Sequence, residues 1–243
     1  MTDQPVAIIS AGASGIGLSC ARALAAAGYR VLTLDINVEA VAAFEAEFGE
    51  GTAGVCDVSH PAQVETALAS LMGACDRVDV LLNNAGIAGP QQPVEEIEVE
   101  AWQSIINTDL NSLFYLTRLV IPFMKTQRSG VILNMSSSAG RYGCPLRSPY
   151  GASTWAALGL SQPWAMELGP WTLRCHALCP ARGAGPAADP RRGWPAPPPG
   201  GTCVAPARPG ARPWVSRCPS PAPPRAPGSR GRKRTTANTR PAS

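Results

Sequence analysis

The sequence predicts an α/β fold built on a parallel β-sheet. Short apolar runs, such as "VAII" at residues 6–9, alternate with longer stretches in which apolar residues recur with the helical period. The first run is followed by a glycine-rich turn and then by a helical pattern that ends at Gly28. Strands that are apolar throughout and are separated by helices are typical of a parallel sheet covered on both faces.

The individual elements follow from these patterns. Strands are expected over about residues 6–9, 30–35, 52–58, 78–82, 131–136 and 172–178, and helices over about residues 15–27, 38–48, 61–74, 100–125 and 150–168. Because strand–helix–strand connections are right-handed, these elements predict a Rossmann-like, doubly wound sheet. Pro163 lies inside the last helix, where a proline costs about 3 kcal/mol if the helix is regular.

The composition of the chain changes abruptly near Pro180. Residues 181–243 contain 15 of the 25 prolines and 12 of the 21 basic residues but a single acidic residue, Asp189, and they show no strand or helix period. We therefore expect a folded domain over residues 1–180 and a Pro/Gly/Arg-rich, low-complexity tail over residues 181–243. Two interpretations of the tail are open: a disordered segment, or the product of a shifted frame in a GC-rich gene.

The charges and the cysteines restrict the class of protein. Residues 1–180 carry 9 basic and 16 acidic residues, so this part has no electrostatic reason to bind nucleic acid or an anionic membrane. The first residues lack the basic start of a signal peptide, and no apolar run is long enough to span a membrane. The six cysteines of this part show no disulfide spacing, which favours the cytoplasm.

A metal site is not expected, although Cys175, His176 and Cys179 lie close together in the sequence. They fall on the predicted strand 172–178 or directly after it. Because side chains alternate between the two faces of a strand, His176 points away from the face that carries Cys175.

A nucleotide site is expected at the first turn, "SAGASGIG" over residues 10–17. Glycines allow a tight turn and let backbone N–H groups approach a pyrophosphate, whose negative charge is favoured at the N-terminus of the following helix. A glycine-rich segment alone is often only a turn, but its place between the first strand and the first helix favours nucleotide binding. The candidate contacts are Ser10, Gly12, Ser14, Gly15, Ile16 and Gly17.

Asp35 closes the second predicted strand, 18 residues after Gly17. A carboxylate at this place can accept hydrogen bonds from both ribose hydroxyls of the adenosine half of a dinucleotide, and it repels a 2′-phosphate. Asp35 therefore favours NAD over NADP as the cofactor. The alternative is an ordinary solvated acid at a strand end.

Two further segments follow strands at the carboxyl edge of the sheet, where open α/β sheets bind their ligands. The motif "NNAG" follows the fourth strand and supplies Asn83, Ala85 and Gly86 as candidate cofactor contacts, although such clusters are often mere turns. Asp57 and Val58 follow the third strand. They are candidates for contact with an adenine ring, or Asp57 simply marks the start of a helix.

Two motifs later in the chain complete a pattern that resembles the short-chain dehydrogenase/reductase family. "NMSSSAG" ends the fifth strand, "YGAS" opens the next helix, and a serine stands 13 residues before the tyrosine. Together with the glycine turn, Asp35 and "NNAG", they carry a resemblance over about residues 5–180. The resemblance implies that Tyr150 exchanges a proton with the substrate and that Ser137 holds the substrate oxygen.

The chain departs from the family pattern at the positions that support this tyrosine. Relatives have a lysine four residues after the tyrosine, where its positive charge favours phenolate and where it binds the nicotinamide ribose; here that position holds Thr154. Asp109, in "NTDLNSLF", stands where relatives have an asparagine that holds the water chain serving the lysine. Ala11 replaces the first glycine of the family's turn.

The resemblance predicts an oxidoreductase that transfers a hydride between NAD(H) and a secondary alcohol or ketone. Relatives continue past the sixth strand with a substrate-covering segment, a helix and a seventh strand, none of which residues 181–243 match, so the usual homodimer or homotetramer contacts are expected to be lost. Two alternatives belong to other classes: a catalytically inactive NAD-binding or interaction protein, and a scaffold whose basic tail binds nucleic acid.

Overall fold

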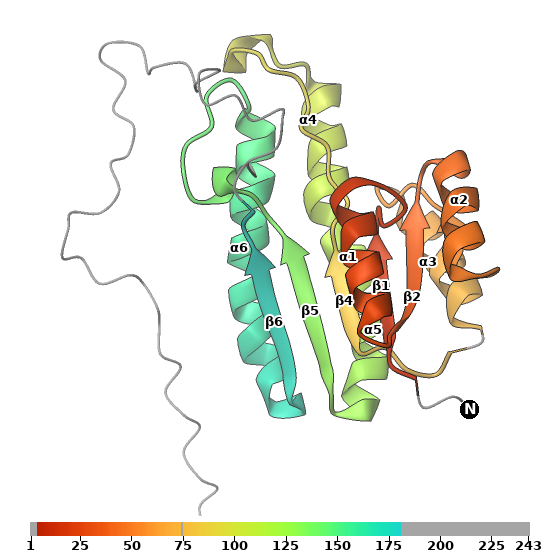
Figure 1. Ribbon diagram of the computed structural model, residues 1–243. Coiled ribbons are helices and arrows are strands. Elements are labelled where there is room, and N and C mark those ends of the chain that lie inside the picture. The colour runs from red at the N-terminus through yellow and green to blue at the C-terminus, as the bar shows by residue number, and fades with distance from the viewer. Residues whose placement is uncertain (1–3, 74, 181–243) are drawn as a thin grey trace, which may run out of the picture. The chain divides into compact units, whose positions relative to one another are not determined.

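The protein contains a six-stranded, all-parallel sheet, which confirms the predicted fold class (Figure 1). The structure is a computed structural model that describes residues 4–73 and 75–180, so the predicted tail lies outside the described residues. The strands stand in the order β3-β2-β1-β4-β5-β6. Their bounds are Val6–Ser10 (β1), Arg30–Asp35 (β2), Ala53–Val55 (β3), Val80–Asn83 (β4), Gly130–Met135 (β5) and Leu173–Leu178 (β6).

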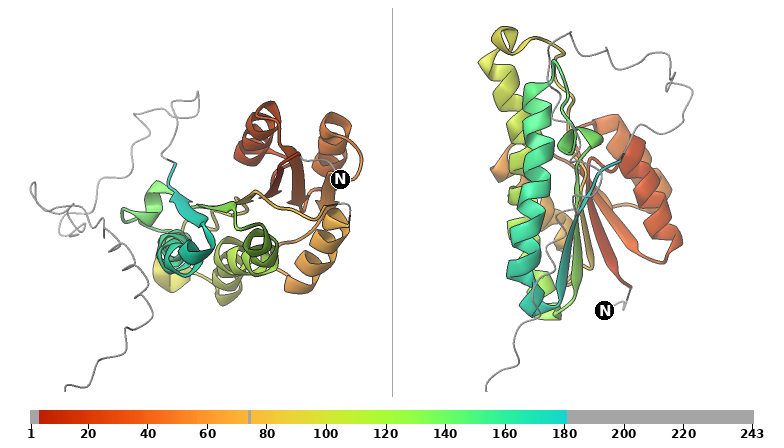
Figure 2. Two further views of the ribbon diagram at one scale, coloured as in Figure 1. Left: turned by 90° about the horizontal axis from the view of Figure 1, so that it is seen from below. Right: turned by 90° about the vertical axis from the view of Figure 1, so that its left-hand side faces the viewer.

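Helices cover both faces of the sheet (Figure 2). The helices are α1 (Gly15–Ala26) and α2 (Val38–Phe48) on one face, and α3 (Pro61–Met72), α4 (Val99–Ile106), α5 (Ser112–Gln127) and α6 (Ser148–Leu168) on the other. Short helical turns are η1 (Val94–Glu96), η2 (Asn107–Asn111), η3 (Ser138–Gly140) and η4 (Gly169–Trp171). No helix in the described ranges is long and apolar enough to cross a membrane.

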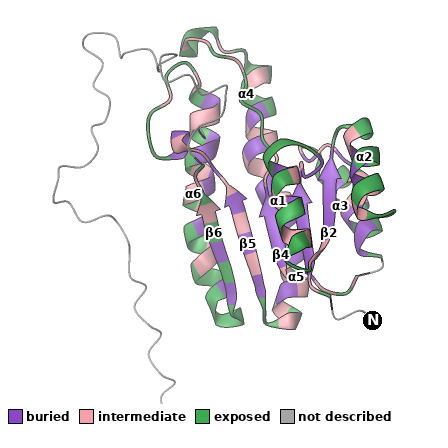
Figure 3. Cartoon of the chain, viewed as in Figure 1, coloured by how far each residue is buried: buried purple, intermediate pink, exposed green. Residues whose placement is uncertain are grey.

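Each face of the sheet has its own apolar core. Leu68 from α3 and Leu116 from α5 pack with Ile132 of β5 on one face, whereas Ala21 from α1 and Phe44 from α2 pack with Ile9 of β1 on the other. Figure 3 shows β1, β2 and β4 buried along their length, while β5 alternates between buried and half-buried residues and β6 is exposed at several positions. Helices α1 and α2 thus cover the β1–β2 part of their face more fully than the β5–β6 part.

The strands and helices expected from the sequence are present in the structure, with small differences in their bounds. The third strand is shorter than expected, because only Ala53–Val55 pair with β2. The expected helix over residues 100–125 is divided into α4 and α5 by a π-helical turn, η2, which contains Asp109. Helix α6 begins at Ser148 and continues through Pro163 to Leu168 without a break. His176 is exposed and Cys175 buried, as strand alternation predicts.

The sheet order reverses beside β1, because β1 pairs with β2 on one side and with β4 on the other. The loops that leave the carboxyl ends of β1 and β4 therefore diverge to opposite faces of the sheet and leave a crevice between them. The glycine turn after Ser10 and the segment after Asn83 both lie at this point.

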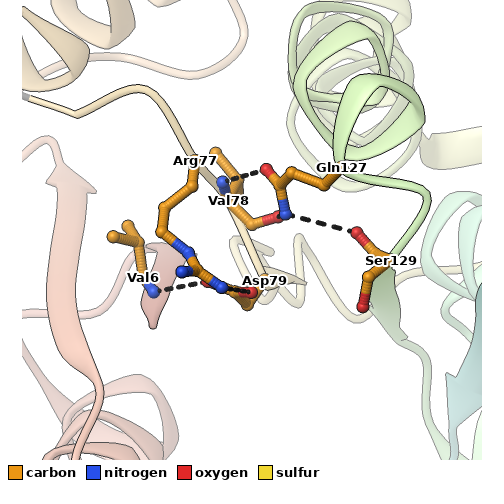
Figure 4. A network of polar contacts seen from close by, with 6 residues as sticks. All are labelled: Val6, Arg77, Val78, Asp79, Gln127 and Ser129. Carbon is orange, nitrogen blue, oxygen red and sulfur yellow. Dashed lines mark hydrogen bonds and ion pairs between the residues drawn. The ribbon is translucent and has the colours of Figure 1, made fainter. Parts of the chain in front are cut away.

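The opposite, amino edge of the sheet is held by a network of side-chain hydrogen bonds (Figure 4). The Gln127 amide, at the end of α5, accepts from the backbone N–H of Val78 at 2.8 Å and donates to the carbonyls of Val78 at 3.0 Å and Ser129 at 3.3 Å. The Asp79 carboxylate accepts from the Val6 N–H at 2.8 Å and pairs with Arg77. This network fixes where β1, β4 and β5 begin.

Replacing Gln127 by alanine should lower the free energy of unfolding by about 1–3 kcal/mol, because the N–H of Val78, a fully buried residue, would lose its acceptor. Chemical denaturation measures the change. Gln103→Ala, on the exposed side of α4, is the control and should change the stability by no more than about 0.5 kcal/mol. Equal effects of the two substitutions would contradict the role given to Gln127.

Ala11 adopts a left-handed backbone conformation with φ 51°, which disfavours a residue with a Cβ atom. Replacing Ala11 by glycine should therefore raise the free energy of unfolding by about 1 kcal/mol. Ala23→Gly, at an exposed position inside α1, should lower it by about the same amount. A destabilising effect of Ala11→Gly in the same denaturation experiment would show that the turn is unstrained.

Candidate active site

A cleft of about 470 Å³ lies at the carboxyl edge of the sheet, where β4, β5, α1 and α6 meet. Residues from six separate segments of the chain line it. The sequence-predicted residues among them are Ile16, Ala85, Gly86, Asp109, Ser137, Tyr150 and Thr154. Sequence reasoning missed Asn84, Ile87, Ala88, Met135, Ser136, Ser138, Ser153 and Pro180.

The glycine turn brings α1 close to the end of β1. A Cβ atom on Gly17 would overlap the carbonyl oxygen of Ala11 and lie 2.8 Å from the Asn84 amide nitrogen, and Gly15 has a φ of +54°. A Cβ atom on Gly12 would overlap the Thr33 hydroxyl, which accepts from the Gly12 N–H. These positions need glycine for packing and conformation, as the motif predicts.

Helix α1 begins at Gly15, and the Ser14 side chain makes no capping hydrogen bond. The first N–H groups of a helix have no acceptor within the helix, and they attract negative charge together with the helix dipole. Ser14, Gly15 and Ile16 are exposed at this end. The N-terminus of α1 is therefore suited to a phosphate group.

The Asp35 carboxylate lies at the end of β2 and joins two turns. One oxygen accepts from the Ala13 N–H at 3.1 Å and the other from the Asn37 N–H at 3.1 Å. Each carboxylate oxygen has further lone pairs for ligand hydroxyl groups. Asp35 is thus more than a solvated acid at a strand end, because it orders the glycine turn and the start of α2.

Ser10 and Asn84 connect the two loops at the crevice. The Ser10 hydroxyl accepts from the backbone N–H groups of Asn84 at 2.9 Å and Ala85 at 3.0 Å, and the Asn84 amide donates to the carbonyls of Ser10 at 3.2 Å and Ala11 at 3.0 Å. Ser10, a predicted cofactor contact, is buried in this junction. The second asparagine of "NNAG" was the signal for Asn84.

Asn83 does not reach the cleft. The residue is 1% exposed, and its amide donates to the Thr117 hydroxyl of α5 at 3.0 Å and to the side-chain oxygen of Asn134 on β5 at 2.8 Å. Asn134 in turn donates to the Ser161 hydroxyl of α6 at 3.0 Å. This buried chain of polar groups joins β4 and β5 to the helices behind them, so the Asn83 side chain supports the strand that carries the site.

Asp57 and Val58 also have structural partners. Asp57 accepts from the Ser59 N–H at 2.9 Å, directly before α3. Burial raises the pKa of this carboxyl, but the hydrogen bonds from Ser59 and the nearby His60 outweigh it and hold the pKa below its usual value. Val58 is buried in the core. Asp57 lies three residues before His60, the N-cap of α3, and outside the cleft lining. Contact of Asp57 and Val58 with an adenine ring stays a prediction.

Ser137 and Tyr150 both line the cleft, from the end of β5 and from the first turn of α6. Both residues are half-buried. The Ser137 hydroxyl accepts a hydrogen bond from the Ala139 N–H at 3.2 Å, so its own proton remains available to a ligand oxygen. The neighbouring Ser136 hydroxyl instead donates to the carbonyl of Thr154 at 2.8 Å and fastens β5 to α6.

The Thr154 hydroxyl is turned back onto its own helix. It donates toward the carbonyls of Tyr150 at 2.9 Å and Gly151 at 3.1 Å, and the residue is 6% exposed. A hydroxyl engaged in this way adds no positive charge beside Tyr150. The described lining residues of the cleft include no lysine, arginine or histidine.

Asp109 is the acidic residue of the cleft lining, and it projects from the π-helical turn η2. The residue is 7% exposed; its carboxylate accepts from the Ile87 N–H at 2.7 Å and from the Ser153 hydroxyl at 3.2 Å. Burial raises the pKa of Asp109 to about 6, although both hydrogen bonds oppose the rise. Above that pH the cleft holds a buried negative charge.

The cleft and the α1 N-terminus together suit a dinucleotide. The crowded Gly17 and the uncapped α1 N-terminus form a cradle for a pyrophosphate, and Asp35 offers acceptors for ribose hydroxyls one strand away. Ser137 and Tyr150 place two hydroxyl groups at the far side of the crevice. Within the described residues, no group of three or more His, Cys, Asp or Glu side chains is placed to hold a metal ion.

Comparisons with known proteins agree with this architecture. A 2-dehydro-3-deoxy-L-rhamnonate dehydrogenase (NAD(+)) from Sphingomonas is 38% identical over 183 residues, which are 75% of this chain and 74% of the relative. An NAD+-bound xylitol dehydrogenase structure matches 74% of this chain and 72% of its own with a TM-score of 0.70 at 31% identity. An actinorhodin polyketide ketoreductase structure with NADPH matches 78% and 75%, with a TM-score of 0.71 at 31% identity.

The family model described as short chain dehydrogenase matches residues 5–193, which extends past the limit at residue 180 that the sequence motifs suggested. The match includes the glycine turn, Ser137 and Tyr150. The chain therefore belongs to the short-chain dehydrogenase/reductase family.

Proposed function

We propose that this chain binds NAD(H) across the crevice and interconverts a secondary alcohol and a ketone. The observation that carries the proposal is the arrangement of two sets of residues around one crevice. Gly15, Gly17 and Asp35 offer a dinucleotide site, and Ser137 and Tyr150 place hydroxyl groups beside it. The relatives described above carry the names of dehydrogenases and a ketoreductase, which supports this class of reaction.

The side chains would divide the work as follows. Gly15, Gly17 and Asp35 would hold NAD+, which would supply the acceptor for the hydride and its two electrons from the alcohol carbon. Tyr150, as its phenolate, would take the proton from the alcohol oxygen, and as the phenol it would return the proton in the reverse direction. The Ser137 hydroxyl donates a hydrogen bond to the same substrate oxygen and holds it near Tyr150, as charge develops on that oxygen.

Asp35 supports NAD as the preferred cofactor. Its carboxylate is held by the Ala13 and Asn37 N–H groups, so its position is fixed before a ligand binds. Ribose hydroxyl groups can donate to it, whereas a 2′-phosphate would bring negative charge against negative charge. The relatives include both NAD+-bound and NADPH-bound structures, so the preference rests on Asp35.

Fluorescence titration should show NADH binding about tenfold or more tightly than NADPH, because of the Asp35 carboxylate. Asp35→Ala should narrow or reverse this ratio, since the Ala13 and Asn37 N–H groups would then be free to meet a phosphate. Glu39→Ala removes an exposed acid from the first turn of α2 and should leave the ratio unchanged. A folded chain that binds neither nucleotide would refute the dinucleotide site.

Thr154→Lys should raise the rate of alcohol oxidation by about 10²–10⁴-fold, because a cation one helical turn after Tyr150 favours the phenolate that accepts the proton. Initial rates with NAD+ and simple secondary alcohols measure the change. Thr154→Met supplies a long side chain without charge and should give no such gain. Equal rates of the lysine and methionine variants, both of which bind NADH, would argue against the role given to Tyr150.

A further inference from the structure

Asp109 is a buried carboxylate without a cation of its own among the described residues. It is 7% exposed and accepts hydrogen bonds only from a backbone N–H and from a serine hydroxyl, both of which are neutral donors. Moving an ionised carboxylate out of water is costly unless positive charge compensates for it. A cation next to this side chain would therefore stabilise its ionised form.

The surroundings of Asp109 define where such a cation can come from. Its neighbours are Ile87 in the loop after β4 and Ser153 on α6, and the space at its carboxylate opens to the same cleft that Ser137 and Tyr150 line. Tyr150 is the other titratable group among the described lining residues. The described lining residues supply no cation to Asp109, whereas the open cleft gives access to one from solution, on a ligand or as a free ion.

We propose that the cleft binds a small primary ammonium group, with Asp109 as its counter-ion. The inference rests on the proposed function and deepens it, because it names amino alcohols and the corresponding amino ketones as the substrate class. The hydroxyl carbon of such a molecule would meet Ser137 and Tyr150, while its ammonium group would meet Asp109 within the same cleft. A free alkylammonium ion is the other source of the same chemistry.

The hydrogen-bonding capacity of the cleft fits an ammonium group. An ammonium group has three donors and no acceptor, so it needs oxygen acceptors around it. The Asp109 carboxylate retains lone pairs beyond its two hydrogen bonds, and the Ser153 oxygen, which acts as a donor here, can still accept. A hydrogen bond between ionised partners is about twice as strong as one between neutral partners.

Two probes of nearly equal shape test the proposal directly. 1-Amino-2-propanol and 2-butanol differ by an ammonium group in place of a methyl group. Saturation-transfer-difference NMR on the full chain, with and without NADH, measures the affinity of each probe without requiring turnover. The amine should bind about tenfold or more tightly at pH 7.5, and its advantage should fall as the pH drops below about 6 and Asp109 takes up a proton.

Two matched variants distinguish an effect of the buried carboxylate on amine binding from an effect of net charge. Asp109→Asn should abolish the advantage of the amine while 2-butanol binds as before. Glu100→Gln, on the exposed side of α4, makes the same change in net charge and should preserve the advantage. Equal affinity of the chain for the two probes, or an advantage that survives in Asp109→Asn, would overturn the proposal.

Methylammonium chloride distinguishes the two sources of the cation. If it competes with 1-amino-2-propanol and also increases the rate of 2-butanol oxidation, the site accepts a free ion; if it competes without such an increase, the ammonium group belongs to the substrate. Both outcomes support the ammonium site. If Asp109→Asn instead weakens NAD+ binding and leaves the probe ratio unchanged, the partner of Asp109 is the nicotinamide cation and the proposal fails.

The failure of this proposal is distinguishable from the failure of the proposed function. If the chain prefers the amine but binds no NADH, the ammonium site is supported and the dehydrogenase function is contradicted. If the chain oxidises 2-butanol with NAD+ but shows no preference for the amine, the dehydrogenase function is supported and the ammonium site is contradicted.

Discussion

The strand order at β1 is the constraint on which the rest of the structure depends. Six parallel strands pair their backbones side by side, and each crossover helix must return on one face of the sheet. Because β2 and β4 flank β1, the chain leaves β1 and β4 toward opposite faces. The crevice between these loops is thus a result of topology, and the cradle at Gly17, the carboxylate of Asp35 and the cleft beside Tyr150 all open onto it or lie one strand away.

The charge within the cleft sets this chain apart from the family pattern. The lysine position holds a threonine whose hydroxyl binds its own helix, and the asparagine position holds a buried acid. Both changes make the cleft more negative than the family pattern, because one removes a positive charge and the other adds a negative charge. No described lining residue supplies a positive charge, so a cationic ligand would complement the carboxylate of Asp109.

Much of the fold could be predicted because buried parallel strands are apolar along their whole length, as in "VAIIS" and "VLLN". Candidate site residues could be predicted where they stand at a strand end or shortly after it, as Asp35 and Ser137 do. Prediction failed where a side chain's direction depends on packing between distant segments. Asn83 and Asn84 are neighbours, yet one faces Thr117 behind the sheet and the other faces Ser10, 74 residues away. The π-helical turn at Asp109 had no sequence period to reveal it.

The junction of Ser10 and Asn84 has a consequence for the thermodynamics of ligand binding. Four hydrogen bonds between these two loops already fix the walls of the crevice before any ligand arrives. Ordering a loop during association subtracts conformational entropy from the affinity, and a preorganised site avoids that loss. Binding of a dinucleotide would therefore lose little free energy to the ordering of these two loops. The heat of binding should then report mainly the contacts of the nucleotide itself.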